Sequence, residues 1–427
     1  MLALIIFLLA LVLLGFGFEM FLVLGLPGLA IKAGYFGALP DIVVGQKIVA
    51  GINQSTLLAI PFFIFAAELM ASGRIARDLT SLVKAFLGHR AGGIGYTTIA
   101  GCAAFGAVSG SAPATVAALG RIMYPELIKA GYRERFALGL IVSSAETALL
   151  IPPSITLIIY GWLTGTSIAG LFAGGLVIGI FLALAFGLYV FVDSIFSDRK
   201  SMPAMPWGER LAVIRAAGWA LGLPVIILGG IYGGIFTPTE AAAVSVVYAV
   251  LVEAVVYREL GLRDLFRVAG QAAITNSVIF ILLGMGSLVS YFITLGQFPA
   301  LVIDFMQTIG ANWLVFLLIV NVLFLLAGMF IDPNSALLLL VPALYPVAMT
   351  FGIDPIHFGL IVCLNICIGM ITPPFGLDIF VASSTLDKPV MTIIAGVWPF
   401  VLINIATLLV VTYVPQLSTF LPKLILG

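Results

Sequence analysis

Two short polar segments interrupt a sequence that is otherwise almost continuously apolar. They are Ser109-Gly-Ser-Ala-Pro-Ala-Thr115 and Ile331-Asp-Pro-Asn-Ser335. Hydroxyl oxygens, and the carbonyls that a helix end exposes, are hard ligands suited to Na⁺, whereas unpaired backbone amides suit a carboxylate. We therefore interpret these segments as a clamp for an ion and a substrate. For the first segment, the alternative is a packing turn made of small residues.

A double proline follows each polar segment at the same distance. Pro152-Pro153 and Pro373-Pro374 lie within apolar runs that are long enough to span a membrane. Two prolines remove two backbone donors and clash with the preceding turn, and the residue before a proline avoids the α conformation. We expect both helices to break there and to expose carbonyls at mid-depth. A kink without a ligand role is the alternative.

Acidic side chains in apolar segments are functional candidates, because burying a charge in a membrane is costly. Asp332 either supplies the negative charge of a Na⁺ site or caps a helix, and both roles can coexist. Glu146 and Asp378 lie in the double-proline runs. Each is compatible with direct ligation, or with neutralising a helix N-terminus or a nearby basic residue. We assign Glu19 and Glu68 to subunit contact or interface placement.

The composition places these residues in a polytopic membrane protein. The chain has 427 residues, of which 62% are hydrophobic and 9% charged, whereas soluble domains carry about 25% charged residues. The formal net charge is zero, which gives no sign of nucleic-acid binding. P-loop, His-Glu-x-x-His and Gly-x-Ser-x-Gly motifs are missing. We therefore predict that the protein is not an enzyme.

Apolar runs of the length that a membrane span needs, about 20 residues, predict an all-α chain. Two further apolar regions, 93–128 and 312–350, are interrupted by the polar segments. Each half is about 15 residues, which is too short to cross, so we predict two re-entrant helical hairpins. Two ordinary spans joined by a tight loop are the alternative. The predicted full spans are 2–24, 48–70, 136–162, 169–195, 213–235, 238–257, 273–293, 358–382 and 391–414.

The distribution of basic residues predicts the orientation, because cytoplasmic loops are enriched in Lys and Arg. With the N-terminus in the cytoplasm and the C-terminus in the periplasm, 16 of the 19 basic residues lie inside, among them Arg199 and Lys200. Lys32, Lys47 and Lys423 lie outside. Both flanks of region 93–128 are basic, which fits a hairpin and two full spans equally.

An internal repeat relates the two halves of the sequence. Tyr124-Pro125 aligns with Tyr345-Pro346, and Pro152-Pro153 with Pro373-Pro374, both at a shift of 221 residues. Five predicted spans separate the two interrupted regions, so the second copy would be inverted. Inverted repeats with broken helices are an architecture of secondary transporters, with the substrate near the midplane.

The motifs Ser109-Gly-Ser-Ala-Pro-Ala-Thr115, Ile151-Pro-Pro-Ser154 with Tyr160-Gly161, and Thr372-Pro-Pro-Phe-Gly376 carry a resemblance to a known family. Across its whole length the chain resembles the large membrane subunit (M subunit, DctM/SiaM-like) of tripartite ATP-independent periplasmic (TRAP) transporters. The resemblance implies the elevator fold of the ion transporter superfamily and uptake driven by Na⁺. It also implies a separate small four-span membrane subunit (Q type) and a periplasmic substrate-binding protein (P type).

By this resemblance, sodium sites lie where the hairpin tips meet the broken helices. The predicted Na⁺ ligands are Ser109, Gly110, Ser111, Pro152, Asp332, Asn334, Thr372 and Pro373. The predicted substrate-binding residues are Ser111, Thr115, Ser154, Asn334, Ser335, Pro374 and Phe375. The predicted domains are 1–70 (scaffold, first spans), 71–170 (transport domain, first repeat, hairpin 93–128, broken helix 136–162), 171–295 (scaffold and arm spans), 296–390 (transport domain, second repeat, hairpin 312–350, broken helix 358–382) and 391–427 (C-terminal span).

These observations predict Na⁺-coupled secondary uptake of a small organic acid across the bacterial inner membrane. Sialic acid, C4-dicarboxylates, other organic acids and zwitterionic solutes are all compatible with the sequence. One alternative is a stand-alone transporter of organic anions coupled to Na⁺ or H⁺. The alternative from another class is a passive channel.

Overall fold

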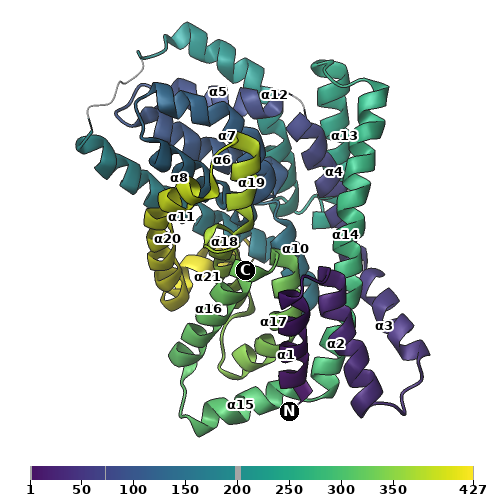
Figure 1. The fold of residues 1–427 in the computed structure, drawn as a ribbon. Helices are drawn as coiled ribbons and strands as arrows, with labels where there is room; N and C mark the ends of the chain where they lie inside the picture. Colours follow the sequence, from purple (N-terminus) through teal and green to yellow (C-terminus); the bar gives the residue numbers. More distant parts are fainter. Residues whose placement is uncertain (1, 73, 198–202, 427) are drawn as a thin grey trace.

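The protein folds into a bundle of α-helices (Figure 1). The computed structural model describes residues 2–72, 74–197 and 203–426, and these ranges contain no strand. Arg199 and Lys200 lie outside them. The elements are α1 (Leu2–Gly15), α2 (Met20–Tyr35), α3 (Ile42–Ile52), η1 (Ser55–Leu58), α4 (Ala59–Ser72), α5 (Ile75–Leu87), α6 (Gly93–Ser109), α7 (Ala112–Lys129), α8 (Glu134–Ala145), α9 (Thr147–Leu150), α10 (Ile155–Thr164), α11 (Ile168–Ile195), α12 (Trp207–Tyr232), α13 (Pro238–Val250), η2 (Leu251–Val256), α14 (Leu262–Leu295), α15 (Phe298–Thr308), α16 (Trp313–Phe330), α17 (Pro333–Thr350), α18 (Pro355–Ile371), α19 (Leu377–Leu386), α20 (Val390–Tyr413) and α21 (Pro415–Leu426).

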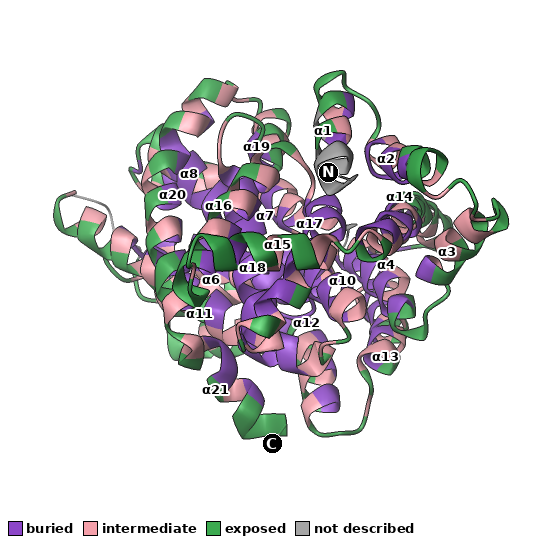
Figure 2. Cartoon of the chain, turned by 90° about the horizontal axis from the view of Figure 1, so that it is seen from below, coloured by how far each residue is buried: buried purple, intermediate pink, exposed green. Residues whose placement is uncertain are grey.

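Helix length and exposed apolar side chains confirm a polytopic membrane protein. In the described ranges, eight helical segments are long and apolar enough to cross a membrane, and a bent pair, Ile42–Ile52 with Ser55–Ala71, makes up to nine. Leu184 and Leu188 on α11 are 66% and 64% exposed, as lipid-facing side chains are. Buried residues gather around α10, α17 and α18, whereas the outer parts of α15 and α21 are exposed (Figure 2).

The first two predicted spans are wrong in their boundaries. Residues 2–24 are not one helix, because α1 ends at Gly15 and α2 begins at Met20. Gly17, with φ +75°, allows the chain to turn between them. The predicted span 48–70 is bent by 53° between α3 and the helix that begins at Ser55. The second break lies at the polar residues Asn53 and Gln54, which a hydropathy average over about 20 residues does not resolve.

Both predicted helix–turn–helix units are present. α6 and α7 are joined by Gly110 and Ser111, and α16 and α17 by Ile331 and Asp332. The helices of each unit pack against each other. The prediction that each half is too short to cross is wrong for α16 and α17, because each has 18 residues and is long and apolar enough to cross a membrane. Helix length therefore does not decide between a re-entrant hairpin and two spans.

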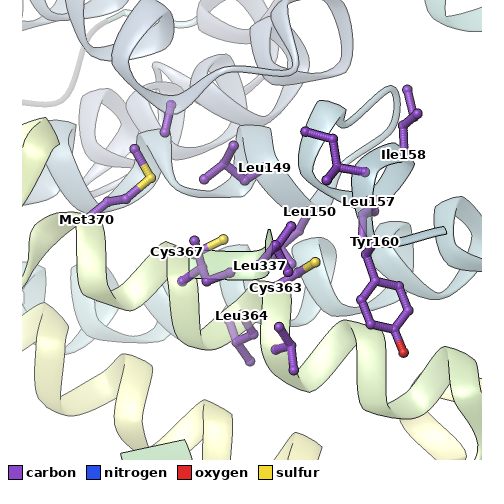
Figure 3. Packing of buried hydrophobic residues seen from close by; sticks show 14 of the residues in the cluster. Leu149, Leu150, Leu157, Ile158, Tyr160, Leu337, Cys363, Leu364, Cys367 and Met370 are labelled. Carbon is purple, nitrogen blue, oxygen red and sulfur yellow. The ribbon is translucent and has the colours of Figure 1, made fainter. Parts of the chain in front are cut away.

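Both double prolines break their helices, as predicted. α9 ends at Leu150 and α10 begins at Ile155, while α18 ends at Ile371 and α19 begins at Leu377. The Pro152-Pro153 and Pro373-Pro374 bonds are cis. The broken helices pack in one apolar core, where Leu150, Leu157 and Tyr160 lie near Leu337, Cys363 and Leu364 (Figure 3). All three cysteines are buried and free.

Each hairpin approaches a broken helix at a glycine, at matching positions of the repeat. A Cβ at Gly106 of α6 would lie 2.6 Å from Ala148 Cα of α9. A Cβ at Gly369 of α18 would lie 2.5 Å from Gly328 Cα of α16. Neither contact admits a side chain at these glycines without a shift of the backbone. The equivalent contacts support the internal repeat.

Candidate functional site

The two polar segments, which are more than 200 residues apart in sequence, line one cavity of about 450 Å³. Ser109, Gly110 and Ser111 contribute from the tip of the first hairpin, and Asp332 and Asn334 from the tip of the second. The cavity falls in the volume range of small-molecule sites. The other lining residues are Ile64, Ala67, Glu68, Ala71, Pro113, Ala114, Leu149, Ile155, Thr156, Ile274, Thr275, Val278, Ile279, Pro333, Met370 and Leu377.

Several helices begin or end at this cavity. The first turns of α7, α10, α17 and α19 contribute lining residues, and so do the last turns of α6, α9 and α18. Helix N-termini present backbone amides that favour anions, and C-termini present carbonyls that favour cations. The remaining wall is made by α4 and α14. The breaks therefore bring both kinds of backbone group to one apolar cavity.

The first tip is a compact hydroxyl turn. Gly110 adopts φ +58°, and a Cβ there would lie 2.4 Å from the carbonyl oxygen of Pro153. Thr115 Oγ1 donates to Ser111 O at 2.8 Å and lies 3.1 Å from Ser109 Oγ. Ser111 Oγ accepts from Ala114 N at 3.4 Å, which caps α7. Glycine is thus needed for both the turn and the contact with the first helix break.

The second tip is organised by Asp332. Its Oδ2 accepts hydrogen bonds from Asn334 N at 3.1 Å and Ser335 N at 3.2 Å, so the predicted capping role is confirmed. Asp332 Oδ1 and Ser335 Oγ are buried and have no hydrogen-bond partner within the described chain. Two oxygens are therefore left for a further partner such as a cation, because unpaired buried polar atoms are costly.

Other predicted site residues do not line the cavity. Ser154 is fully buried; its hydroxyl accepts from Leu157 N at 3.3 Å and donates to Leu149 O at 2.5 Å. Thr372 Oγ1 donates to Ile368 O at 2.6 Å. The remaining residues of this group are Thr115, Pro152, Ser335, Pro373, Pro374 and Phe375. Helix breaking is therefore the visible role of the prolines.

Phe375 was predicted to contact substrate, and the structure places it on the molecular surface. Its side chain is 58% exposed, and its ring packs against Phe330 with centroids 5.7 Å apart. The contact joins the second break to the end of α16. Pro374 beside it is also exposed.

Three polar residues that line the cavity were not predicted as site residues. They are Glu68 on α4, Thr156 on α10 and Thr275 on α14. Glu68 is an acid within an apolar segment, and that was its signal; the structure places it in the cavity wall, whereas the sequence analysis assigns it to subunit contact or interface placement. Thr156 lies two residues after Ser154, so the first break itself pointed to it. Thr275 belongs to the polar triplet Thr275-Asn276-Ser277 within an apolar run, and that triplet was the available signal for it.

Glu146 and Asp378 lie behind the cavity rather than in it. Asn404 Nδ2 on α20 donates to Glu146 Oε2 at 2.8 Å, and Asp378 is close enough to act on Glu146 electrostatically. Neither acid forms an ion pair within the described residues, and both Asp378 oxygens have no hydrogen-bond partner there. Pairing with a basic residue and capping of α19 by hydrogen bonds are thus not their roles in this structure.

Charged contacts away from the cavity tie the first hairpin to the second broken helix. Lys388 Nζ lies 2.9 Å from Glu134 Oε1, and Tyr124 donates to the same oxygen at 2.8 Å. The Glu134 carboxylate, followed by the Tyr124 hydroxyl, raises the pKa of Lys388 above its usual range. Such an exposed contact contributes little stability, but it marks where the two units meet.

A family model described as the DctM component of the tripartite ATP-independent periplasmic transporter matches residues 5–417. The chain belongs to this family. It is 40% identical over 397 residues to the ectoine TRAP transporter large permease protein of Halomonas elongata, covering 93% of this chain and 92% of that protein. It is 38% identical to the C4-dicarboxylate TRAP large permease of Pseudomonas aeruginosa and 37% identical to the sialic acid TRAP large permease of Vibrio cholerae, with 90% of each chain covered in both cases.

Among solved structures, the YdaH transporter of Alcanivorax borkumensis matches the chain with a TM-score of 0.58. The match covers 86% of both chains at 14% identity and therefore concerns the fold alone. Membership of the TRAP large permease family, together with the long apolar helices, makes the chain a multi-pass transport protein. Its relatives are named as permeases and not as enzymes, as the sequence predicted. Proteins of this family work with a periplasmic binding protein and usually with a small membrane subunit.

Proposed function

We propose that this TRAP large permease carries out Na⁺-coupled secondary uptake of a small organic acid by an elevator mechanism. Substrate would arrive from a P-type periplasmic binding protein, and a Q-type four-span subunit would complete the membrane part. The observation that carries the proposal is the single cavity at which both hairpin tips and both helix breaks meet. Secondary transporters hold substrate and coupling ions at such breaks.

The oxygens at the two tips support Na⁺ as the coupling ion. The residues fit a hard cation, because Asp332 Oδ1 and Ser335 Oγ are buried oxygens without a partner in the described chain. At the first tip, Ser109 and Thr115 add hydroxyls next to Ser111 O. Na⁺ bound there would be transported as cargo and would bring the positive charge that a buried aspartate needs.

The walls of the cavity support an elevator. α4 and α14 belong to the parts that we predict to be scaffold and arm, and the hairpin tips and breaks belong to the predicted transport domain. The cavity lies between these two groups. A transport domain that slides along α4 and α14 would carry the cavity from one side of the membrane to the other.

The substrates named for the relatives define the range of candidate substrates for this permease. Ectoine, C4-dicarboxylate, sialic acid and isethionate permeases all match the chain at 36–40% identity. All four substrates are small and carry an acidic group. We therefore propose a small organic acid and expect the binding protein to contribute much of the selection.

Uptake into proteoliposomes tests the proposal. The chain is reconstituted with its small subunit, and the binding protein and labelled substrate are added outside. We expect accumulation above equilibrium only with an inward Na⁺ gradient, and loss of that accumulation in the Ser111→Ala, Asp332→Ala double variant. Accumulation at the wild-type level in this variant would contradict the proposal. Equilibration without accumulation would indicate a channel, and uptake without the binding protein a stand-alone transporter.

A further inference from the structure

A second hollow, which we call the lateral groove, lies between α6 and α11 and has a volume of about 720 Å³. It shares no lining residue with the cavity at the hairpin tips. Its walls are apolar except for Arg90 and Tyr96, and within the described residues its lining contains no carboxylate. The two helices contribute Tyr96, Ile99 and Ala103 from α6 and Leu184, Gly187 and Phe191 from α11. The groove thus combines an apolar surface with one positive charge.

One side of the lateral groove faces outward. Leu184, Leu188 and Phe191 of α11 line it, and their side chains are exposed, as those of lipid-facing residues are. The other side contains buried residues, among them Ile99 of α6 and Ile151 at the first helix break. The groove therefore extends from an outward-facing apolar rim to the back of the first break.

Gly187 keeps the middle of the lateral groove open. A Cβ at this glycine would meet no heavy atom closer than Tyr96 Cε1, at 3.9 Å. Near the start of α6 the packing is tighter, because a Cβ at Gly95 would lie 2.8 Å from Val190 Cγ1 of α11. The two helices thus touch at Gly95 and leave free space at Gly187. A larger side chain at position 187 would occupy this space without a backbone clash.

The length of the lateral groove matches one leaflet of a bilayer. Its lining on α11 extends from Ile180 to Phe191, which is about 16 Å at the rise of an α-helix, and half of the hydrocarbon core is about 15 Å. Arg90 belongs to segment 71–92, which we predict to be cytoplasmic from its basic residues. The groove therefore has the length of an acyl chain of the cytoplasmic leaflet, with Arg90 at the level of the headgroups.

Arg90 gives this end of the groove a preference for a negative headgroup. Its side chain is exposed, forms no ion pair within the described residues, and lies close enough to Tyr96 to act on it electrostatically. A guanidinium binds phosphate through parallel hydrogen bonds, and the cytoplasmic surface of a membrane contains anionic lipids. An apolar helix of a partner protein would fill the groove but leave the charge unmatched, whereas an anionic phospholipid supplies both parts.

We propose that the lateral groove binds an anionic phospholipid of the cytoplasmic leaflet, with one acyl chain against Gly187 and the phosphate at Arg90. The chain would pack against Ile151 and so support the first helix break from the membrane side. The inference depends neither on the substrate nor on the coupling ion of the proposed function.

Lipid binding to the purified full-length chain tests the inference. Phosphatidylglycerol and phosphatidylcholine with identical acyl chains are added to the protein in a neutral detergent. The melting temperature is then measured, since a ligand that binds the folded state stabilises it. We expect phosphatidylglycerol to bind about fivefold more tightly than phosphatidylcholine, which is the effect of one basic residue near an anionic headgroup.

Two substitutions, each with a matched control, locate the lipid. Gly187→Phe should fill the groove and remove the stabilisation by lipid. Gly218→Phe on α12 should keep it, because Gly218 is exposed and its added Cβ would have no heavy atom within 4 Å. Arg90→Gln should abolish the difference between the two lipids, and Arg263→Gln, at another exposed arginine of the predicted cytoplasmic side, should keep it. Melting temperatures without added lipid show whether each variant is folded.

Four results would overturn the inference. They are equal binding of the two lipids by the wild type, an unchanged preference in Arg90→Gln, full lipid binding by Gly187→Phe, and loss of the lipid effect when the small membrane subunit is added. The last result would make the groove a subunit interface. Failure of the proposed function is seen separately, as an absence of Na⁺-driven accumulation in proteoliposomes.

Discussion

Single residues at the hairpin tips combine structural and functional roles. Asp332 caps α17 with one carboxylate oxygen and leaves the other buried without a partner in the described chain. Gly110 permits a left-handed turn and at the same time allows close contact with Pro153. In both cases the residue type is set by local backbone geometry, and the same geometry brings oxygens to the cavity. Substitutions at such residues should therefore affect both stability and transport.

Gly110→Ala tests the tip contact. We expect a lower melting temperature, by more than about 1 kcal/mol of unfolding free energy, together with loss of Na⁺-driven uptake. The added Cβ would meet the Pro153 carbonyl oxygen in addition to the unfavourable φ. Gly131→Ala is the matched control, because Gly131 has φ +85° and no heavy atom within 4 Å of the added Cβ. Equal effects of the two substitutions would mean that only the backbone conformation matters.

The buried acids behind the cavity lead to a second prediction. Glu146 and Asp378 lie close together in an apolar environment, and neither has an ion-pair partner among the described residues. We expect the neutral isostere Asp378→Asn to keep or raise the melting temperature, since a buried acid without a basic partner is costly. Thermal unfolding in detergent measures this. A marked decrease, seen only when Na⁺ is present, would show instead that this carboxylate binds the cation.

At the scale of elements, the site is built from helix ends. Four helices begin and three end around one cavity, and glycine contacts hold the hairpins against the broken helices. A buried polar network, none of whose members lines the cavity, also joins these elements: Asn365 Nδ2 donates to Asn321 Oδ1 at 2.8 Å, and Asn321 Nδ2 donates to Thr412 Oγ1 at 3.0 Å. It links α16, α18 and α20, so the second hairpin and the second broken helix should move as a unit.

Gly369→Leu tests the close packing of α16 on α18. Overpacking a tight contact costs about 1–3 kcal/mol, so we expect a lower melting temperature and reduced uptake. Gly270→Leu on α14 serves as the control, because its added Cβ would have no heavy atom within 4 Å. Both variants replace a glycine within a helix. Only the side chain at position 369 would clash with a neighbouring helix. If both melt at the wild-type temperature, the contact does not hold the two helices together.

Local chemistry explains which elements could be predicted. The double prolines and the two polar segments break helices through their own backbone properties, so their positions were predicted correctly. The turn between α1 and α2 was missed, because Gly17 lies in an apolar run that hydropathy reads as continuous. The position of Glu68 in the cavity depends on how α4 packs against distant segments. Nothing in the sequence around it distinguishes a cavity wall from a subunit interface.

At the scale of the whole molecule, the distribution of Lys and Arg predicts the orientation of the chain in the membrane. The fold alone does not test this orientation. Segment 258–267 carries Arg258, Arg263 and Arg267 and should be cytoplasmic, whereas segment 296–311 has no Lys or Arg and should be periplasmic. One helix, α14, joins them. At about 1.5 Å per residue, its 34 residues span about 50 Å, more than the hydrocarbon core. Opposite sides for its two ends are therefore physically possible.

Labelling of single cysteine substitutions tests this orientation in whole cells. The native cysteines Cys102, Cys363 and Cys367 are fully buried and should not react. We expect Asp304→Cys on α15 to react with a membrane-impermeant maleimide from outside, and Arg263→Cys to react only after permeabilisation, since both positions are exposed. The unsubstituted chain is the control for background labelling. The reverse pattern would invert the proposed topology, and labelling of both positions from outside would mean that α14 does not cross the membrane.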